Sequence, residues 1–256
     1  MAHTYVQLCG QLVFELHGRR VEQRIPSRQT RTLFAYLVLQ RPRAVGRDEL
    51  IEAIWAGSAP RNHAQAVTVL VSKLRAAVGP DVLAGRGSVR IALPDAARVD
   101  VEYALAAAHR AESAVVQHAW KRGWGAGLGA QLVASRRLLP EQDGLPWLDA
   151  WRRRLDDTFE RALQAYASAC LALGGTELAG AERAARRLLD HNSLHETAYG
   201  LLMQALAAQG HVPEALRVYE RARTALRDEL GIPPGAAIAR LHTDLLAGRQ
   251  VNARAG

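Results

Sequence analysis

A chain of 256 residues, 49% of them hydrophobic, is long enough for one or two domains with buried cores, and no apolar run approaches the length of a membrane span. The net charge of +8 is uneven, because residues 1–95 hold 13 Lys/Arg and 7 Asp/Glu whereas residues 96–256 hold 20 and 18. The basic excess in the first part favours a polyanion such as nucleic acid over a membrane, for which the sequence offers no basic helix with a broad aromatic face.

The first residues do not resemble a signal peptide, and the two cysteines, Cys9 and Cys170, lie far apart in apolar patterns. Buried free thiols are favoured over a disulfide, which suits a reducing compartment. We therefore expect a cytoplasmic protein.

Residues 5–25 alternate weakly between apolar and polar side chains and are interrupted by Gly10 and Gly18, which predicts about three short antiparallel strands. Ser27 follows a proline and can cap a helix that runs from Arg28 to about Gln40. The chain is therefore expected to begin with a small sheet followed by a helix.

The segment from Asn62 to Val78 carries apolar residues at helical spacing, with Asn62 as a possible N-cap and Gly79 as the stop. The buried stripe is expected to hold Val67, Val71, Leu74 and Val78. The other face offers hydroxyls and cations that suit phosphate oxygens and base edges, namely Thr68, Ser72, Lys73 and Arg75. The alternative is an amphipathic helix whose polar face is merely solvated.

A second short helix is expected over residues 47–55, and residues 82–93 read as two strands around a Gly-rich tip. The order of strands, helix, helix, helix and hairpin is that of a helix-turn-helix with a wing. The region resembles the OmpR-type winged helix. The resemblance rests on the recognition-helix motif Val71-Ser72-Lys73-Leu74-Arg75 and on the preceding Arg47-Asp48-Glu49-Leu50 with Ile54-Trp55.

From residue 99 the chain reads as entirely helical, with helices expected over 103–116 and from Trp151 to about Leu173. The glycines of residues 123–129 are expected to interrupt the helices as a loop, and residues 138–148 form a second turn-rich link. A phosphate-binding loop at 123–129 is disfavoured, because the segment follows a helix and lacks the Gly-Lys-Ser/Thr ending.

Small and aromatic residues then recur 34 positions apart, which is the spacing of tetratricopeptide-like helix pairs. The pairs are Ala165 and Tyr199, Ala169 and Met203, Ala172 and Leu206, Ala181 and Ala215, Ala185 and Tyr219, and Leu188 and Ala222. Each helix pair can bury its face only against the next, so the segment is expected to stack into a short superhelix. A final helix is expected over Ala236–Leu246, followed by a frayed tail.

The end of the chain resembles the bacterial transcriptional activator domain. The residues that carry this resemblance are Leu194-His195-Glu196, Leu202 to Leu206, Gly210, Glu214-Ala215-Leu216, Tyr219, Arg223, Leu226 to Gly231, Pro234 and Leu241. An OmpR-type winged helix followed by this domain is the arrangement of the Streptomyces antibiotic regulatory protein family. The resemblance covers residues 5–247 and implies a transcriptional regulator, usually an activator of a nearby pathway gene cluster.

The expected fold is mainly α with a small β component. The expected domains are an OmpR-type winged helix over 1–95, a tetratricopeptide-like activator domain over 96–248 and a frayed tail over 249–256. The resemblance implies binding to double-stranded DNA on tandem promoter half-sites, self-association on DNA, contact with RNA polymerase or a second protomer, and a place in the nucleoid. The residues expected to contact DNA are Arg61, Asn62, Gln65, Thr68, Ser72, Lys73, Arg75, Arg86 and Arg90.

Two departures from the family pattern bear on DNA reading. Val69 and Leu70 stand where relatives often carry polar groups, and Lys73 replaces an arginine, which substitutes a point charge for a bidentate fork. If both apolar residues were exposed, they would favour an alternative function as a protein-interaction scaffold. A ligand sensor is a further alternative, because Trp120, Trp124, Trp147 and Trp151 lie close in sequence, although core packing explains them more simply.

No catalytic constellation is recognised, and neither an enzyme nor a cofactor is expected. His191, His195 and His211 do not have the spacing of a helical metal-ligand pair, and no cysteine or carboxylate cluster joins them. Surface or capping roles are expected for these histidines.

Overall fold

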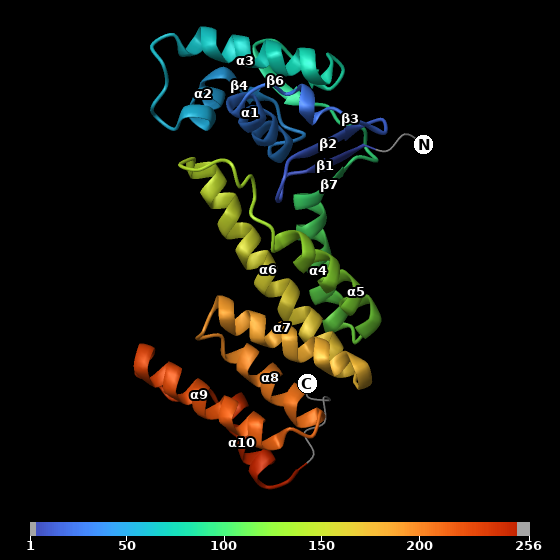
Figure 1. Ribbon diagram of the computed structural model, residues 1–256, viewed down its shortest axis with the longest axis vertical. Coiled ribbons are helices and arrows are strands. Elements are labelled where there is room, and N and C mark those ends of the chain that lie inside the picture. Colours follow the sequence, from blue (N-terminus) through green and yellow to red (C-terminus); the bar gives the residue numbers. More distant parts are fainter. Residues whose placement is uncertain (1–3, 250–256) are drawn as a thin grey trace. The chain divides into compact units, whose positions relative to one another are not determined.

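The computed structural model describes residues 4–249 and divides the chain into two compact units (Figure 1). The first unit combines residues up to 103 with residues 133–156, and the second combines residues 104–132 with residues from 157 onward. The expected frayed tail lies outside the described residues except for its first position. The predicted class, mainly α with a small β component, is confirmed.

A four-stranded sheet begins the first unit, in the order β3-β2-β1-β7. Strands β1 (Tyr5–Gln7), β2 (Val13–Leu16) and β3 (Arg19–Arg20) are antiparallel neighbours, as predicted, and a 3-10 turn, η1 (Glu22–Arg24), follows them. The fourth strand, β7 (Arg98–Val99), pairs with β1 in parallel and was not predicted. The next residue, Asp100, is buried, and its carboxylate accepts hydrogen bonds from the backbone N–H groups of Leu8 at 2.9 Å and Cys9 at 2.8 Å.

Three helices and a second sheet complete the winged helix. They are α1 (Arg28–Leu39), α2 (Arg47–Trp55) and α3 (His63–Val78), with strands β4 (Val45–Gly46), β5 (Leu83–Ala84) and β6 (Ser88–Ile91) in the order β4-β6-β5. Ser27 caps α1 as predicted, because its hydroxyl accepts from the N–H of Thr30 at 3.2 Å. The predicted hairpin over residues 82–93 is confirmed as β5 and β6.

Residues 135–156 also belong to the first unit. Leu138 bridges to Cys9, the N–H of Leu139 donates to the carbonyl of Leu8 at 3.0 Å, and Leu148 is fully buried. The predicted turn-rich link is shorter than expected, because helix α6 (Pro146–Leu173) already begins at residue 146, where the proline suits the first helical turn.

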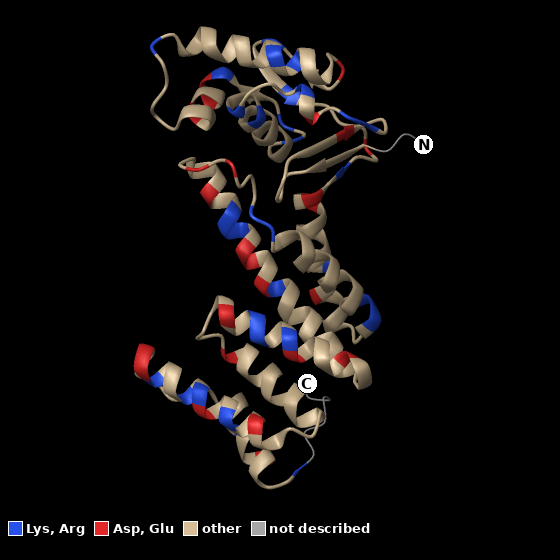
Figure 2. Cartoon of the chain, in the orientation of Figure 1, with Lys and Arg blue, Asp and Glu red and all other residues tan. Residues whose placement is uncertain are grey.

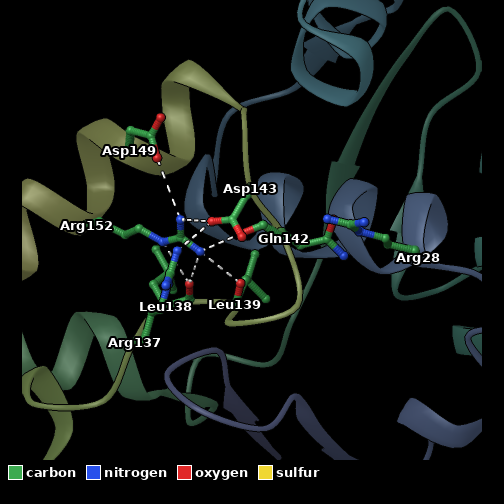
Figure 3. Close-up of polar contacts among 8 residues, drawn as sticks. All are labelled: Arg28, Arg137, Leu138, Leu139, Gln142, Asp143, Asp149 and Arg152. Atoms are coloured by element: carbon green, nitrogen blue, oxygen red, sulfur yellow. Dashed lines mark hydrogen bonds and ion pairs between the residues drawn. The ribbon is translucent and has the colours of Figure 1, made fainter.

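Arg152 of α6 holds the link in its folded form (Figure 3). Its guanidinium donates to the backbone carbonyls of Leu138, Leu139 and Gln142, with the shortest contact 2.6 Å to Gln142, and to the carboxylate of Asp143 at 2.8 Å. The side chain of Gln142 in turn accepts from Nε of Arg28 at 2.8 Å, so the link is bonded to α1. One largely buried guanidinium thus satisfies several turn carbonyls.

The second unit begins with parts of α4 (Asp100–Val116), α5 (Trp120–Ala134) and α6, which meet at a buried cluster of alanines, namely Ala107, Ala108, Ala130 and Ala162. The predicted loop at residues 123–129 is wrong, because α5 runs through it. The glycines permit close helix packing: a Cβ at Gly127 would lie 3.0 Å from Cβ of Tyr166 and 3.1 Å from the carbonyl oxygen of Ala162. The backbone of α5 therefore approaches α6 more closely than a side chain would allow.

A stack of helix pairs follows. It contains a 3-10 turn, η2 (Gly175–Glu177), and helices α7 (Leu178–His191), α8 (Glu196–Ala208), α9 (Val212–Leu230) and α10 (Ala236–Leu246). Figure 1 shows α7, α8 and α9 succeeding one another. The residues of the 34-residue repeat fall on equivalent helices, α6 with α8 and α7 with α9, and its small members Ala169, Ala181, Ala185, Ala215 and Ala222 are fully buried. No described helix is long and apolar enough to cross a membrane.

Candidate nucleic-acid interface

Helix α3 presents one buried and one exposed face. The stripe of Val67, Val71, Leu74 and Val78 is buried as predicted. Leu70 is also buried, with only 6% of its surface exposed, whereas Val69 is 40% exposed. The condition set for the scaffold alternative, that both residues are exposed, is therefore not met by Leu70, and Val69 is the large apolar side chain on the exposed face of α3.

The start of α3 is open to solvent. Arg61, Asn62 and Gln65 are all exposed. Asn62 occupies the N-cap position but its side chain makes no capping hydrogen bond, so the predicted capping role is wrong. A side-chain amide that does not cap its own helix is available for other contacts.

Thr68, in the middle of the exposed face, is bonded to two other groups. Its hydroxyl donates to the carbonyl of Ala64 at 2.9 Å and accepts from Nη1 of Arg47 at 2.6 Å. Nη2 of Arg47 reaches the carbonyl of Arg86 at 3.2 Å. Arg47, the first residue of α2, thus touches both α3 and the wing, a role that helix periodicity alone does not reveal.

Ser72 and Lys73 are exposed, but Arg75 is partly covered and is used within the protein. Its Nε donates to the carbonyl of Leu83 at 3.2 Å and its Nη2 to that of Gly85 at 2.6 Å. The expectation that Arg75 belongs to the free polar face therefore needs correction, because its guanidinium is bonded to the wing at Leu83 of β5 and at Gly85.

The tip of the wing, residues 85–87, carries Arg86, and Arg90 follows on β6; both arginines are exposed. Gly85 has φ +95°, and a Cβ there would lie 2.1 Å from the carbonyl oxygen of Ser88, so the turn requires glycine. Figure 2 shows basic positions on α3 and in the segments around it. The arrangement places cations on two neighbouring elements of one unit.

Helices α1 and α2 are joined by a hydrogen-bonded group of three residues, Tyr36, Arg43 and Glu49. Glu49 accepts from Nη2 of Arg43 and from the hydroxyl of Tyr36, both at 2.5 Å. Hydrogen bonding to Arg43, and then to Tyr36, lowers the pKa of Glu49 to about 2. Burial, together with the bond to Glu49, raises the pKa of Tyr36 to about 12.

Several of the histidines, tryptophans and cysteines considered in the sequence have local structural contacts. Nδ1 of His195 accepts from the N–H of Ala198 at 3.3 Å and so caps α8. Trp147 packs edge-on against Tyr36, whereas Trp124 donates to Glu177 at 2.8 Å in the second unit. Cys9 and Cys170 are buried free thiols. Within residues 4–249 no group of three or more His, Cys, Asp or Glu side chains could hold a metal ion.

Comparison with known families accounts for both parts of the chain. The family described as "Bacterial transcriptional activator domain" matches residues 96–246, and the family described as "Transcriptional regulatory protein, C terminal" matches residues 23–90. The chain is therefore built as a transcriptional regulator, with an OmpR-type winged helix followed by an activator domain. It belongs to the Streptomyces antibiotic regulatory protein family, as the sequence motifs predicted.

Several named regulators are similar to the chain. Regulatory protein AfsR of Streptomyces coelicolor is 30% identical over 86% of this chain, and that of Streptomyces griseus is 28% identical over 89%. Transcriptional regulatory protein EmbR of Mycobacterium tuberculosis is 27% identical over 96% of it. The chain spans only 22% and 23% of the two AfsR proteins and 64% of EmbR.

A solved structure shares the fold. Mycobacterium tuberculosis EmbR, in complex with a low-affinity phosphopeptide, superposes with a TM-score of 0.84 at 24% identity, over 98% of this chain and 67% of that one. At this identity the likeness establishes the fold.

Proposed function

We propose that this chain binds duplex DNA through α3 and the wing and activates transcription from the promoter it binds. The observation that carries the proposal is the exposed face of α3, where Gln65, Ser72 and Lys73 lie within about one turn of Val69. Helix α3 is bonded to the wing through Arg75, and the wing carries the exposed arginines Arg86 and Arg90. A helix of this kind fits the major groove, and a basic hairpin beside it reaches the backbone or the minor groove.

The exposed residues fall into two groups, readers, which are proposed to contact base edges, and positioners, which are proposed to contact phosphates. Gln65 and Lys73 have side chains that hydrogen-bond to base edges, and the exposed methyl groups of Val69 suit contact with a thymine methyl. Arg61, Asn62, Ser72, Arg86 and Arg90 suit phosphate oxygens, which fix the position of the protein without reading sequence. The net charge of +6 on residues 1–95 supports this electrostatic contribution.

A single winged helix buries little surface, so tight binding is expected to need two protomers on tandem half-sites about one helical turn apart. The stacked helix pairs α7 to α10 are the surface proposed to contact RNA polymerase or the second protomer. This contact would take place at the promoter, so the protein is proposed to act in the nucleoid. Residues 1–95 supply DNA binding in this scheme and residues 96–248 supply activation.

The test is a binding titration on promoter and random duplexes of equal length at several salt concentrations. We expect a promoter preference and an affinity that falls steeply with salt. Arg86→Ala should weaken binding to both duplexes alike and flatten the salt dependence by about one unit per lost phosphate contact. Lys73→Ala should instead reduce the preference for the promoter.

Absence of promoter preference in the wild type at every salt concentration would favour the alternative, an interaction scaffold that no longer reads DNA. Burial of Leu70 leaves Val69 as the large exposed apolar residue of α3, which weakens the case for an extended adhesive surface on this helix. Identical behaviour of Lys73→Ala and Arg86→Ala would contradict the division into readers and positioners.

A further inference from the structure

Two guanidinium groups, one from α2 and one from α3, donate hydrogen bonds to backbone carbonyls of the wing. Arg47 of α2 donates to the carbonyl of Arg86, and Arg75 of α3 donates to the carbonyls of Leu83 and Gly85. The carbonyls of Gly85 and Arg86 lie in the turn that joins β5 to β6, and the carbonyl of Leu83 lies in β5.

We propose that Arg47 and Arg75 are positioning residues that hold the wing at a fixed place beside α3, and that they act through these wing carbonyls rather than through phosphate contacts. The inference rests on the proposed DNA-binding function and adds two residues whose role is to set the geometry of the interface. Arg75 was expected to touch DNA from its place in the recognition helix, and Arg47 was not expected to take part.

The tip of the wing needs such support because it lies outside the strand ladders, although β6 itself pairs with β4 as far as Ser88 on its other side. The β5–β6 ladder contains the pairs Leu83–Ile91 and Ala84–Arg90 and stops before the tip. The tip has the sequence Gly85-Arg86-Gly87, and glycines lose more conformational freedom on ordering than any other residue. Hydrogen bonds from a charged guanidinium are roughly twice as strong as neutral ones, so they are well suited to hold this loop.

The guanidinium of Arg47 also holds α3, the helix proposed to contact base edges. Its Nη1 bonds to the hydroxyl of Thr68 while its Nη2 bonds to the wing, so one planar group joins α2, α3 and the wing. A binding site that spans two elements requires both to be held within a fraction of an ångström. The promoter preference is therefore expected to depend on Arg47 and Arg75 even without a base contact.

The experiment uses the full chain with Arg47→Lys and Arg75→Lys, each measured singly. Lysine retains the charge but lacks the fork that bonds two acceptors at once. Amide hydrogen exchange of residues 84–88 is followed in the protein without DNA, and titrations on promoter and random duplexes are then run at several salt concentrations. Arg90→Lys is the matched control for the exchange measurement alone, because it changes a wing arginine for which the described residues show no bond to a wing carbonyl.

We expect exchange at 84–88 to accelerate in both variants and not in the control. The preference for the promoter over the random duplex should fall about fivefold, which corresponds to the loss of one hydrogen bond. The salt dependence should be unchanged. Arg75→Met extends the test, because removing the charge as well should still leave the salt slope intact if Arg75 contacts no phosphate.

Unchanged wing exchange in both lysine variants would overturn the proposal. A salt slope reduced by about one unit in Arg75→Met would also overturn it for Arg75, by identifying a phosphate contact. If the wild type shows no promoter preference, the proposed function fails on its own, and the exchange measurement on the free protein still decides whether the two arginines hold the wing.

Discussion

The indole N–H of Trp147 donates a hydrogen bond of 2.8 Å to the backbone carbonyl of Ala53. The donor lies in the first turn of α6, within the residues matched by the activator-domain family, and the acceptor lies in α2 of the winged helix. The same indole packs edge-on against Tyr36 of α1 with ring centroids 5.1 Å apart. The first compact unit therefore draws on residues from both family matches.

Trp147→Phe should destabilise this unit by about 0.5–1.5 kcal/mol, because an aromatic ring is retained against Tyr36 while the hydrogen bond to Ala53 is lost. The free energy of unfolding in urea, followed by circular dichroism, measures the change. Trp151→Phe, one turn further along α6, is the control, since its indole stacks with Arg154 at 4.8 Å and a phenyl ring preserves much of that contact. Equal losses in the two variants would contradict the role given to the Trp147 bond.

Arg152→Met should loosen the link at residues 138–143. The side chain of Arg152 is only 14% exposed, and its removal leaves several turn carbonyls without their donor, at a cost of about 1.5–3 kcal/mol. Limited proteolysis followed by mass spectrometry should detect new cleavage between residues 137 and 145. Arg153→Met, at the exposed neighbouring position, should leave the cleavage pattern unchanged.

The domain boundary at residue 95 stays a prediction, and proteolysis of the wild type tests it. Cleavage is expected near Pro94–Ala97, where a short segment joins β6 to β7. The Gly-rich segment 123–129, first expected to be a loop, should resist cleavage because it is helical. Preferential cutting within α3 would refute the proposed division.

Gly127 and Gly125 of α5 provide a test substitution and its control. Gly127→Ala should destabilise the second unit by about 1–3 kcal/mol, because the new Cβ would press on Tyr166 and Ala162 of α6. At Gly125 the structure has nothing within 4 Å of the added Cβ, so Gly125→Ala should stabilise the helix by about 0.5–1 kcal/mol. Thermal unfolding measures both, and stabilisation by Gly127→Ala would show that α5 and α6 do not pack so closely.

Glu49 should make the stability of the first unit depend on pH in the acid range. Its pKa is lowered from 4.5 to about 2 by Arg43 and Tyr36, so its contribution is fully present above pH 4.5 and is lost as the pH falls towards 2. Glu49→Gln should unfold at a lower urea concentration than the wild type at neutral pH. The difference between the two urea midpoints should become smaller as the pH falls from 4.5 towards 2. Urea midpoints measured every half unit of pH provide the comparison, and a constant difference would exclude the lowered pKa.

The spacing of apolar residues predicted those parts of the fold in which the local sequence is sufficient to determine the structure. The stripe of α3 and the 34-residue repeat were placed correctly, because apolar spacing records which face must be buried. The loop expected at 123–129 was wrong because glycine lowers helix propensity locally, whereas the partner helix that needs Gly127 lies some 40 residues later, at Tyr166.

The candidate site was predictable to a similar extent. Sequence placed Ser72 and Lys73 on the exposed face of α3, but it could not show that Arg75 turns towards the wing, because the acceptor carbonyls become available only when the hairpin folds back. Arg47 was noticed as part of a helix motif, and its contact with Thr68 depends on how α2 and α3 pack. Side-chain contacts between elements are set by tertiary packing, which spacing along one element does not encode.

The two strands that pair in parallel, β1 and β7, have a consequence for synthesis of the protein. Tyr5 and Val6 emerge from the ribosome early, but their partners Arg98 and Val99 emerge only after the wing is complete, and Leu138 and Leu148 later still. Strand β1 must wait with one side unpaired while these residues are translated, and such unpaired edges invite pairing with other chains. The winged helix is first in the sequence, yet the compact unit that contains it is complete only after residue 156 has been translated.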